Sequence, residues 1–149
     1  MKKIFQTANS WSSFIIRVML GIVIFPHGAQ KLFGWFGGNG FAGTMSFFTE
    51  KMHIPVFFAF LAIIAESLGS MGLWIGFLTR VAAFGILCNM IVAIWMVHWP
   101  NGFFMNWFGK QAGEGFEYHL LVIGMCLALL ISGGGRWSVD RAIAPSPKE

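Results

Sequence analysis

Charged residues are scarce in this sequence. They make up 11% of its 149 residues, whereas hydrophobic residues make up 56%. A water-soluble domain carries about 25% charged residues, because its surface must be hydrated. The few charges between Ile4 and Ser132 mostly stand at the ends of apolar runs. This composition argues against a soluble enzyme and predicts an integral membrane protein.

Cysteines are few, and basic stretches and nucleotide-binding motifs are missing. Cys88 and Cys126 each lie inside an apolar run, which excludes a disulfide framework. They form no Cys-x-x-Cys pair, so a redox dithiol between them is a minor alternative. The net charge is +4, but no basic stripe exists that a nucleic acid could follow. No Gly-x-x-x-x-Gly-Lys-Ser/Thr motif is present for binding nucleotide phosphates.

What the sequence does contain is a set of long apolar runs. A transmembrane helix needs about 20 predominantly apolar residues. Four segments meet this requirement, at about 11–33, 55–78, 80–99 and 116–132. Only a tight turn at 76–80 separates the second from the third, so these two are expected to form an antiparallel hairpin. The sequence therefore predicts an all-α fold: a four-helix transmembrane bundle forming one domain, residues 1–149.

Lysine and arginine residues predict how the bundle is oriented, because they accumulate on the cytoplasmic side of membrane proteins. The termini and the short turn carry Lys2, Lys3, Arg80, Arg136, Arg141 and Lys148, whereas the other side carries Lys31, Lys51 and Lys110. Both termini are therefore expected in the cytoplasm of a bacterium, with the protein crossing the cytoplasmic (inner) membrane several times. Residues 41–52, in the first outer loop, are expected to form a short helix on the membrane surface.

Ionisable residues inside the apolar runs are candidates for function, because charge is costly within a bilayer. At about 1.5 Å per residue, Glu66 lies roughly 18 Å and His27 roughly 22 Å from the cytoplasmic ends of their helices, so the two are expected to meet. Arg17 is shallower, but its long side chain is expected to reach Glu66 and keep it ionised. These three are the predicted catalytic residues. Arg17 shares a stripe with Gly21 and Gly28, which indicates that this face of the helix points into the bundle.

A second polar group is expected near the outer ends of the helices. It is predicted to bind an anionic substrate and comprises Lys31, His98, Glu117 and His119. Histidine and glutamate are also metal ligands. However, Glu117 and His119 point about 200° apart around a helix, so no metal site is predicted.

Structural explanations compete with both predicted groups. An Arg17–Glu66 ion pair can fix the register of two helices without any chemistry. His27 and Lys31 can be boundary residues whose polar ends reach the membrane surface. The outer residues lie close enough to that surface for hydration alone to account for them. The sequence leaves these alternatives open.

Several motifs, taken in order, resemble those of the DoxX family over about residues 17–141. They are RVMLG at 17–21, HGAQKLFG at 27–34, AESLG at 65–69, GFLTR at 76–80, NGFF at 101–104, GFEY at 115–118 and GGGRWSVD at 133–140. The resemblance implies a four-helix membrane protein. Proteins similar in this way include the membrane subunit of thiosulfate:quinone oxidoreductase. The family's polar positions fall on Arg17, His27, Lys31, Glu66, Arg80, Glu117 and Asp140.

The function expected from these features is that of a subunit or accessory factor in a quinone-linked redox system, for instance one that oxidises sulfur compounds. The sequence does not identify a cofactor, and a quinone is the candidate. The expected contacts are the lipid bilayer, a protein partner in a redox complex and further copies of the chain, with no nucleic acid. A non-enzymatic membrane scaffold or chaperone partner is the alternative. A small-solute or proton transporter is third, since no broken helices or inverted repeat are evident.

Overall fold

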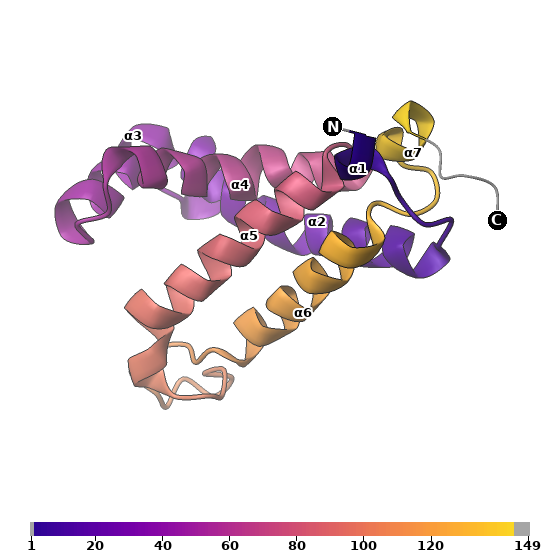
Figure 1. Cartoon of the computed structure of the whole chain (residues 1–149). Coiled ribbons are helices and arrows are strands. Elements are labelled where there is room, and N and C mark those ends of the chain that lie inside the picture. Colours follow the sequence, from indigo (N-terminus) through magenta and orange to yellow (C-terminus); the bar gives the residue numbers. More distant parts are fainter. Residues whose placement is uncertain (1, 145–149) are drawn as a thin grey trace.

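The computed structural model describes residues 2–144, with side chains from Ile4 onward, and all of its regular elements are helices. No strand occurs in this described part of the chain. The elements, labelled where space allows in Figure 1, are α1 (Lys2–Phe5), α2 (Trp11–Leu32), η1 (Trp35–Gly37), α3 (Gly40–Ser46), η2 (Phe47–Lys51), α4 (Val56–Ile75), α5 (Thr79–Ala93), η3 (Ile94–His98), η4 (Trp99–Asn101), α6 (Glu117–Ser132) and α7 (Val139–Ile143).

Each of the four predicted apolar runs contains a long helix. Three helical stretches are long and apolar enough to cross a membrane: Trp11–Leu32, Val56–Ile75 and Thr79–Asn101, which joins α5 to η3 and η4. The fourth, α6, has 16 residues. At about 1.5 Å per residue it is roughly 24 Å long, shorter than the hydrocarbon core of about 30 Å. The all-helical prediction is confirmed.

Helices α2 and α4 form the most intimate pair in the molecule, and they lie alongside each other in Figure 1. Their close approach depends on glycine. A Cβ atom on Gly28 would lie 2.4 Å from the backbone oxygen of Glu66 and 2.6 Å from the Cα of Ser67. A Cβ on Gly21 would lie 2.9 Å from the backbone oxygen of Ser70. The prediction that this stripe of α2 faces another helix is therefore confirmed.

The hydrophobic core lies where α5 and α6 pack on each other and on the α2–α4 pair. Figure 1 shows α5 and α6 inclined to α2 and α4. The buried core residues are Leu20, Ile24, Leu73, Ala82, Ala83, Ile86, Met90, Val122, Cys126 and Leu129. Cys126 is buried in this core, whereas Cys88 is exposed, and both are free thiols. A redox dithiol of these two residues therefore finds no support in the fold.

The two ends of the molecule differ in construction. At one end, which we term the terminal end, α1 and α7 lie close together with the α4–α5 turn (Figure 1). The amide of Ala8 donates to the carbonyl of Ser132 at 3.0 Å, and the amide of Arg136 donates to the carbonyl of Ser10 at 3.1 Å. The other end, which we term the loop end, carries residues 33–55 and 99–116. The predicted short helix at 41–52 is present there as α3 and η2.

We predict that Gly28→Ala separates α2 from α4, because the new methyl group would overlap backbone atoms that cannot turn aside. The expected loss of stability is about 1–3 kcal/mol. Gly124→Ala on the exposed face of α6, where a Cβ would meet nothing within 4 Å, is the matched control and should be neutral or slightly stabilising. Melting temperatures in detergent measure both variants. Equal melting temperatures would show that the close α2–α4 contact does not limit stability.

Candidate functional site

Arg17 is fully buried at the terminal end, with 0% of its surface exposed. Its guanidinium group donates five hydrogen bonds, all to backbone carbonyls. Two acceptors, Leu73 and Trp74, are in the last turn of α4, where the helix dipole favours a cation. The other acceptors follow α6: the carbonyls of Gly134 at 2.8 Å, Arg136 at 3.2 Å and Trp137 at 2.8 Å.

Asp140 completes this arrangement from the opposite side. Its side chain is buried and accepts hydrogen bonds from the first amides of α5, Leu78 at 2.7 Å and Thr79 at 2.9 Å. Its own amide donates to the carbonyl of Gly76 at 2.9 Å. Gly76 has φ of +69°, and a Cβ there would lie 2.4 Å from the Cβ of Ser138. We term Arg17, Gly76, Asp140 and the segment 134–138 the terminal clamp.

The predicted pairing of Arg17 with Glu66 is wrong. Arg17 lies near the start of α2, and its guanidinium turns to the C-terminal carbonyls of α4, two helical turns beyond Glu66 along the same helix. All five of its N–H donors are engaged there. The prediction compared the positions of ionisable side chains along the helices. It could not identify these acceptors, because they are backbone atoms of a loop and of a helix end.

Glu66 pairs with Lys31 instead. The Lys31 Nζ atom lies 2.6 Å from Glu66 Oε2, and the two side chains are 24% and 9% exposed. The same ammonium also donates to the backbone carbonyl of His27 at 3.4 Å, one helical turn earlier. Side chains on a helix lean toward its N-terminus, which brings Lys31 back from the loop end to the level of Glu66. Lys31 is therefore not directed toward the membrane surface.

Asn89 of α5 is a third member of this group. Its amide donates to Glu66 Oε1 at 3.3 Å and to the carbonyl of Ala62 at 2.8 Å. Asn89 is not among the site residues predicted from sequence, although an amide in the middle of an apolar helix was the available signal. The ion pair and this amide connect α2, α4 and α5 between otherwise apolar faces, and we term Lys31, Glu66 and Asn89 the polar triad.

His27 lies beside the polar triad, within electrostatic range of both Lys31 and Glu66. No hydrogen bond joins the side chains of His27 and Glu66 in the described structure. His27 is exposed on α2, and the centroid of its ring is 6.4 Å from the ring of Tyr118 on α6. His27 and Glu66 are therefore neighbours, as expected, but they are connected through Lys31, whose ammonium donates to the His27 carbonyl and to the Glu66 carboxylate.

A row of rings continues from Tyr118 across α6. The ring centroids are 5.4 Å apart for Tyr118 and His119 and 4.0 Å apart for His119 and His98. His119 is only 7% exposed, and its Nδ1 atom has no hydrogen-bond partner. The Tyr118 hydroxyl is also buried without a partner. Buried polar atoms are nearly always paired, so these two are unusual. The buried Thr79 hydroxyl at the terminal end also has no partner.

Glu117 does not join the two histidines. Its carboxylate accepts a hydrogen bond from the amide of Met105 at 2.8 Å and so holds the loop that precedes α6. His98 Nδ1 lies 2.8 Å from the carbonyl of Glu114 in the same loop. The predicted outer group is thus divided: His98 and His119 meet, Lys31 belongs to the polar triad and Glu117 faces the loop. Among residues 2–144, no three His, Cys, Asp or Glu side chains are placed to hold a metal ion.

The polar triad, His27, Tyr118 and His119 form the candidate site. The arrangement offers one ion pair, one amide, one hydroxyl and two imidazoles between apolar helices. Such groups can hydrogen-bond the carbonyl oxygens of an apolar ligand and can exchange protons with it.

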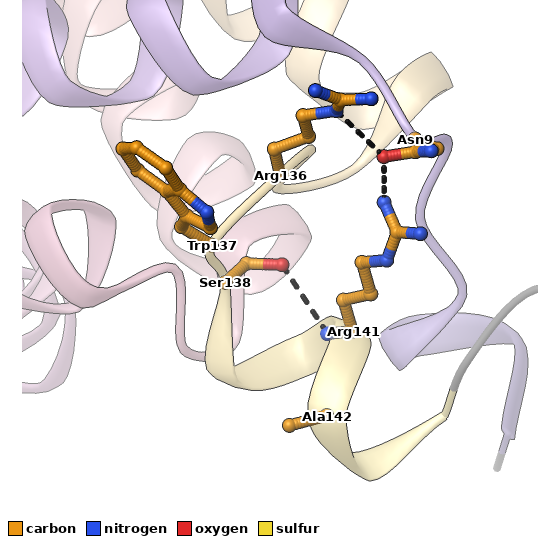
Figure 2. Close-up of a pocket in the computed structure, with 6 residues that line it drawn as sticks. All are labelled: Asn9, Arg136, Trp137, Ser138, Arg141 and Ala142. Atoms are coloured by element: carbon orange, nitrogen blue, oxygen red, sulfur yellow. Dashed lines mark hydrogen bonds between the residues drawn. The ribbon is translucent and has the colours of Figure 1, made fainter.

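A separate pocket of about 510 Å³ lies at the terminal end, far along α2 from this site, and is lined by Asn9, Arg136, Trp137, Ser138, Arg141 and Ala142 (Figure 2).

Comparison with known proteins places this geometry in a family of membrane proteins. The family model described as DoxX matches residues 12–99. The chain is 33% identical over 140 residues to "Uncharacterized membrane protein Rv3486" of Mycobacterium tuberculosis, covering 89% of this chain and 82% of that protein. It is 30% identical over 110 residues to "Inner membrane protein YqjF" of Escherichia coli, covering 74% of this chain and 79% of that protein.

A third relative has a name that refers to an activity. The chain is 29% identical over 117 residues to "Putative oxidoreductase CatD" of Bacillus subtilis, covering 78% of this chain and 77% of that protein. No solved structure matches the chain. Together with the long apolar helices, these relatives identify a membrane protein.

We predict that Arg17→Lys destabilises the fold even though it preserves the charge. An ammonium has three donors for five carbonyls, so buried acceptors lose their partners. The expected cost is about 2–5 kcal/mol. Arg141→Lys, at a side chain that makes a single hydrogen bond to Asn9, is the control and should change stability by less than about 0.5 kcal/mol. Unfolding in detergent measures both, and equal losses would refute the assignment of Arg17 to the terminal clamp.

Proposed function

The chain belongs to the DoxX family, and we propose that it acts as the membrane subunit of a quinone-linked redox system. In this proposal, the candidate site binds the quinone ring and supplies the protons that quinone reduction consumes. The observation that carries the proposal is the pair of unpartnered buried atoms, Tyr118 Oη and His119 Nδ1, beside a buried ion pair. The name of the CatD relative, an oxidoreductase, points to the same class of reaction.

The proposal includes four membrane spans with both termini in the cytoplasm. Because residues 8–10 hydrogen-bond to residues 132–136, both ends of the described chain are at the same side of the bundle. This favours an even number of crossings, and three helices already meet the length for a span. Helix α6 is then the fourth, and local thinning of the bilayer accommodates its shorter length. Arg80, Arg136 and Arg141 at the terminal end favour the cytoplasm for that side.

The residues present suit a quinone head group. The Tyr118 hydroxyl can donate to one carbonyl oxygen, and the imidazole of His119 can donate once its ring carries a proton at Nδ1. Exposed phenylalanine and leucine side chains on the helices suit an isoprenoid tail lying in lipid. When bound, a quinone accepts two electrons and two protons to become a quinol.

In this scheme, the Glu66 carboxylate, ionised in its pair with Lys31, accepts a proton from His27 and passes it to the site. Lys31 holds the Glu66 carboxylate after the proton has left, through the 2.6 Å ion pair. Asn89 fixes the other carboxylate oxygen. These three residues therefore provide one protonatable group with a defined orientation.

The electrons come from a reduced sulfur anion in our proposal. Two thiosulfate ions join through a new S–S bond to give tetrathionate and release the two electrons that the quinone requires. The imidazoles of His98 and His119, whose ring centroids are 4.0 Å apart, would donate hydrogen bonds to the anion, whereas the Lys31 charge is already paired with Glu66. Glu117 has no part in this step, because its carboxylate holds the loop at Met105.

A non-enzymatic scaffold is the second candidate, and the terminal clamp favours it. Arg17 and Asp140 show that this chain uses buried charge to hold segments together without any ligand. If the polar triad serves the same purpose, the chain is a membrane partner for a protein that carries the chemistry. The two candidate functions differ in the effect expected from removing the Glu66 charge: the redox function requires that quinol formation falls, and the scaffold function does not.

We predict that a reporter fused after residue 144 detects the cytoplasm. Green fluorescent protein placed there should fluoresce, and alkaline phosphatase inserted after Lys110 should be active outside. Both results follow from four spans with the positive side inward. Active phosphatase with a dark fluorescent protein at the C-terminal fusion would indicate an odd number of spans.

We predict that Glu66→Gln lowers thiosulfate-dependent quinol formation in membranes by about 10²-fold or more, the usual contribution of a positioned acid. The amide has one acceptor oxygen in place of two, so its NH2 group faces either Asn89 or Lys31 and a lower melting temperature is expected as well. Activity is therefore compared per amount of folded protein. Glu50→Gln on η2 removes the same charge from an exposed side chain and should leave activity unchanged. Full activity in the Glu66 variant, with quinone still bound, would assign the polar triad to the scaffold alone.

A further inference from the structure

The pocket at the terminal end contains two guanidinium groups that share one neutral acceptor. Arg136 Nε donates to Asn9 Oδ1 at 2.9 Å, and Arg141 Nη1 donates to the same oxygen. Figure 2 shows Asn9 between the two arginines, with the indole of Trp137 beside them. No carboxylate among residues 2–144 forms an ion pair with either arginine.

The positive charges of Arg136 and Arg141 have no negatively charged partner among the described residues. A guanidinium group has five N–H donors, and each of these two uses one for Asn9. The amide of Asn9 is neutral, so it does not balance the charges of the two guanidinium groups that donate to its oxygen. The pocket of about 510 Å³ next to them is large enough for a small anionic group. Its electrostatics therefore favour a ligand with a net negative charge.

The surroundings of the pocket indicate where that anion comes from. The Trp137 ring is 73% exposed and lies 5.0 Å from the ring of Trp11, while Arg136 lies 5.0 Å above the same Trp11 ring. Tryptophans gather at the level of lipid head groups. From Trp11 an exposed apolar stripe continues along α2 through Ile15, Met19 and Ile22, one helical turn apart. A ligand seated here would place its anion on the arginines and an acyl chain on this stripe.

We propose that this pocket binds the phosphate group of an anionic phospholipid from the adjacent leaflet. A lipid with net negative charge is preferred to a zwitterionic one, whose choline would bring a third cation toward the two arginines. The bound lipid bridges residue 9, before α2, and residues 136–141, after α6. It thereby holds the segment before α2 against the segment that follows α6, and it is independent of the candidate site at the loop end.

The test is native mass spectrometry of the purified full chain after exchange into detergent with phosphatidylglycerol or phosphatidylcholine. The wild-type protein should retain phosphatidylglycerol and should melt at a higher temperature with it than with phosphatidylcholine. Arg136→Gln combined with Arg141→Gln should weaken retention about tenfold or more. Lys51→Gln combined with Lys110→Gln removes the same charge from the loop end and should leave retention unchanged. Equal retention in the two double variants would overturn the proposal.

A second variant separates lipid binding from misfolding. Asn9→Asp places a carboxylate between the two guanidinium groups and so supplies the missing counter-ion within the chain. It should weaken the preference for phosphatidylglycerol, because it balances one of the two charges, while keeping or raising the melting temperature without lipid. Unchanged lipid preference in this variant contradicts the proposal. If inorganic phosphate alone displaces the lipid and gives the same stabilisation, the site takes a soluble phosphate and the lipid assignment is wrong.

Discussion

The buried guanidinium of Arg17 is the constraint on which the arrangement of this molecule depends. A charge within a bilayer is tolerated only when every polar atom finds a partner. Five backbone carbonyls from two separate segments, the end of α4 and residues 134–137, meet this need. The chain after α6 must therefore return across the terminal end, and three successive glycines at 133–135 allow it to pass there. A Cβ on Gly135 would lie 2.6 Å from the carbonyl oxygen of Ser10.

This requirement divides the polar groups of the protein into two kinds. At the terminal end every donor of Arg17 and both oxygens of Asp140 are occupied by backbone atoms, although the buried Thr79 hydroxyl beside them has no partner. Toward the loop end, the polar triad is flanked by a hydroxyl and an imidazole nitrogen that have no partner. Saturation by the chain itself accounts for Arg17 and Asp140 without a ligand, whereas the hydroxyl and imidazole nitrogen beside the polar triad can hydrogen-bond one. The same reasoning separates Arg17 from Arg136 and Arg141.

The sequence predicts the helices well because apolar runs of this length have few alternatives in a membrane. It also predicts that the glycine stripe of α2 faces another helix. It does not predict the partners of the buried charges. The acceptors of Arg17 are carbonyls, which every residue has, so no residue type reveals them. Lys31 was placed with the outer residues by its position along α2, but its side chain leans back by one turn to reach Glu66. Glu117 is held by the Met105 amide of a loop whose course the sequence does not reveal.

The Lys31–Glu66 pair has little left to do for the fold. Fixing the register of α2 against α4 is the usual structural explanation for such a pair. Yet Gly28 already sets that register at the same level, since its Cα face lies directly on the backbone of Glu66. A buried ion pair is also weak evidence for stability, because apolar residues of the same volume often serve as well. The pair further differs from Arg17 in that Lys31 is partly exposed and its surroundings are unsaturated. These features favour a chemical role for the pair over a purely structural one.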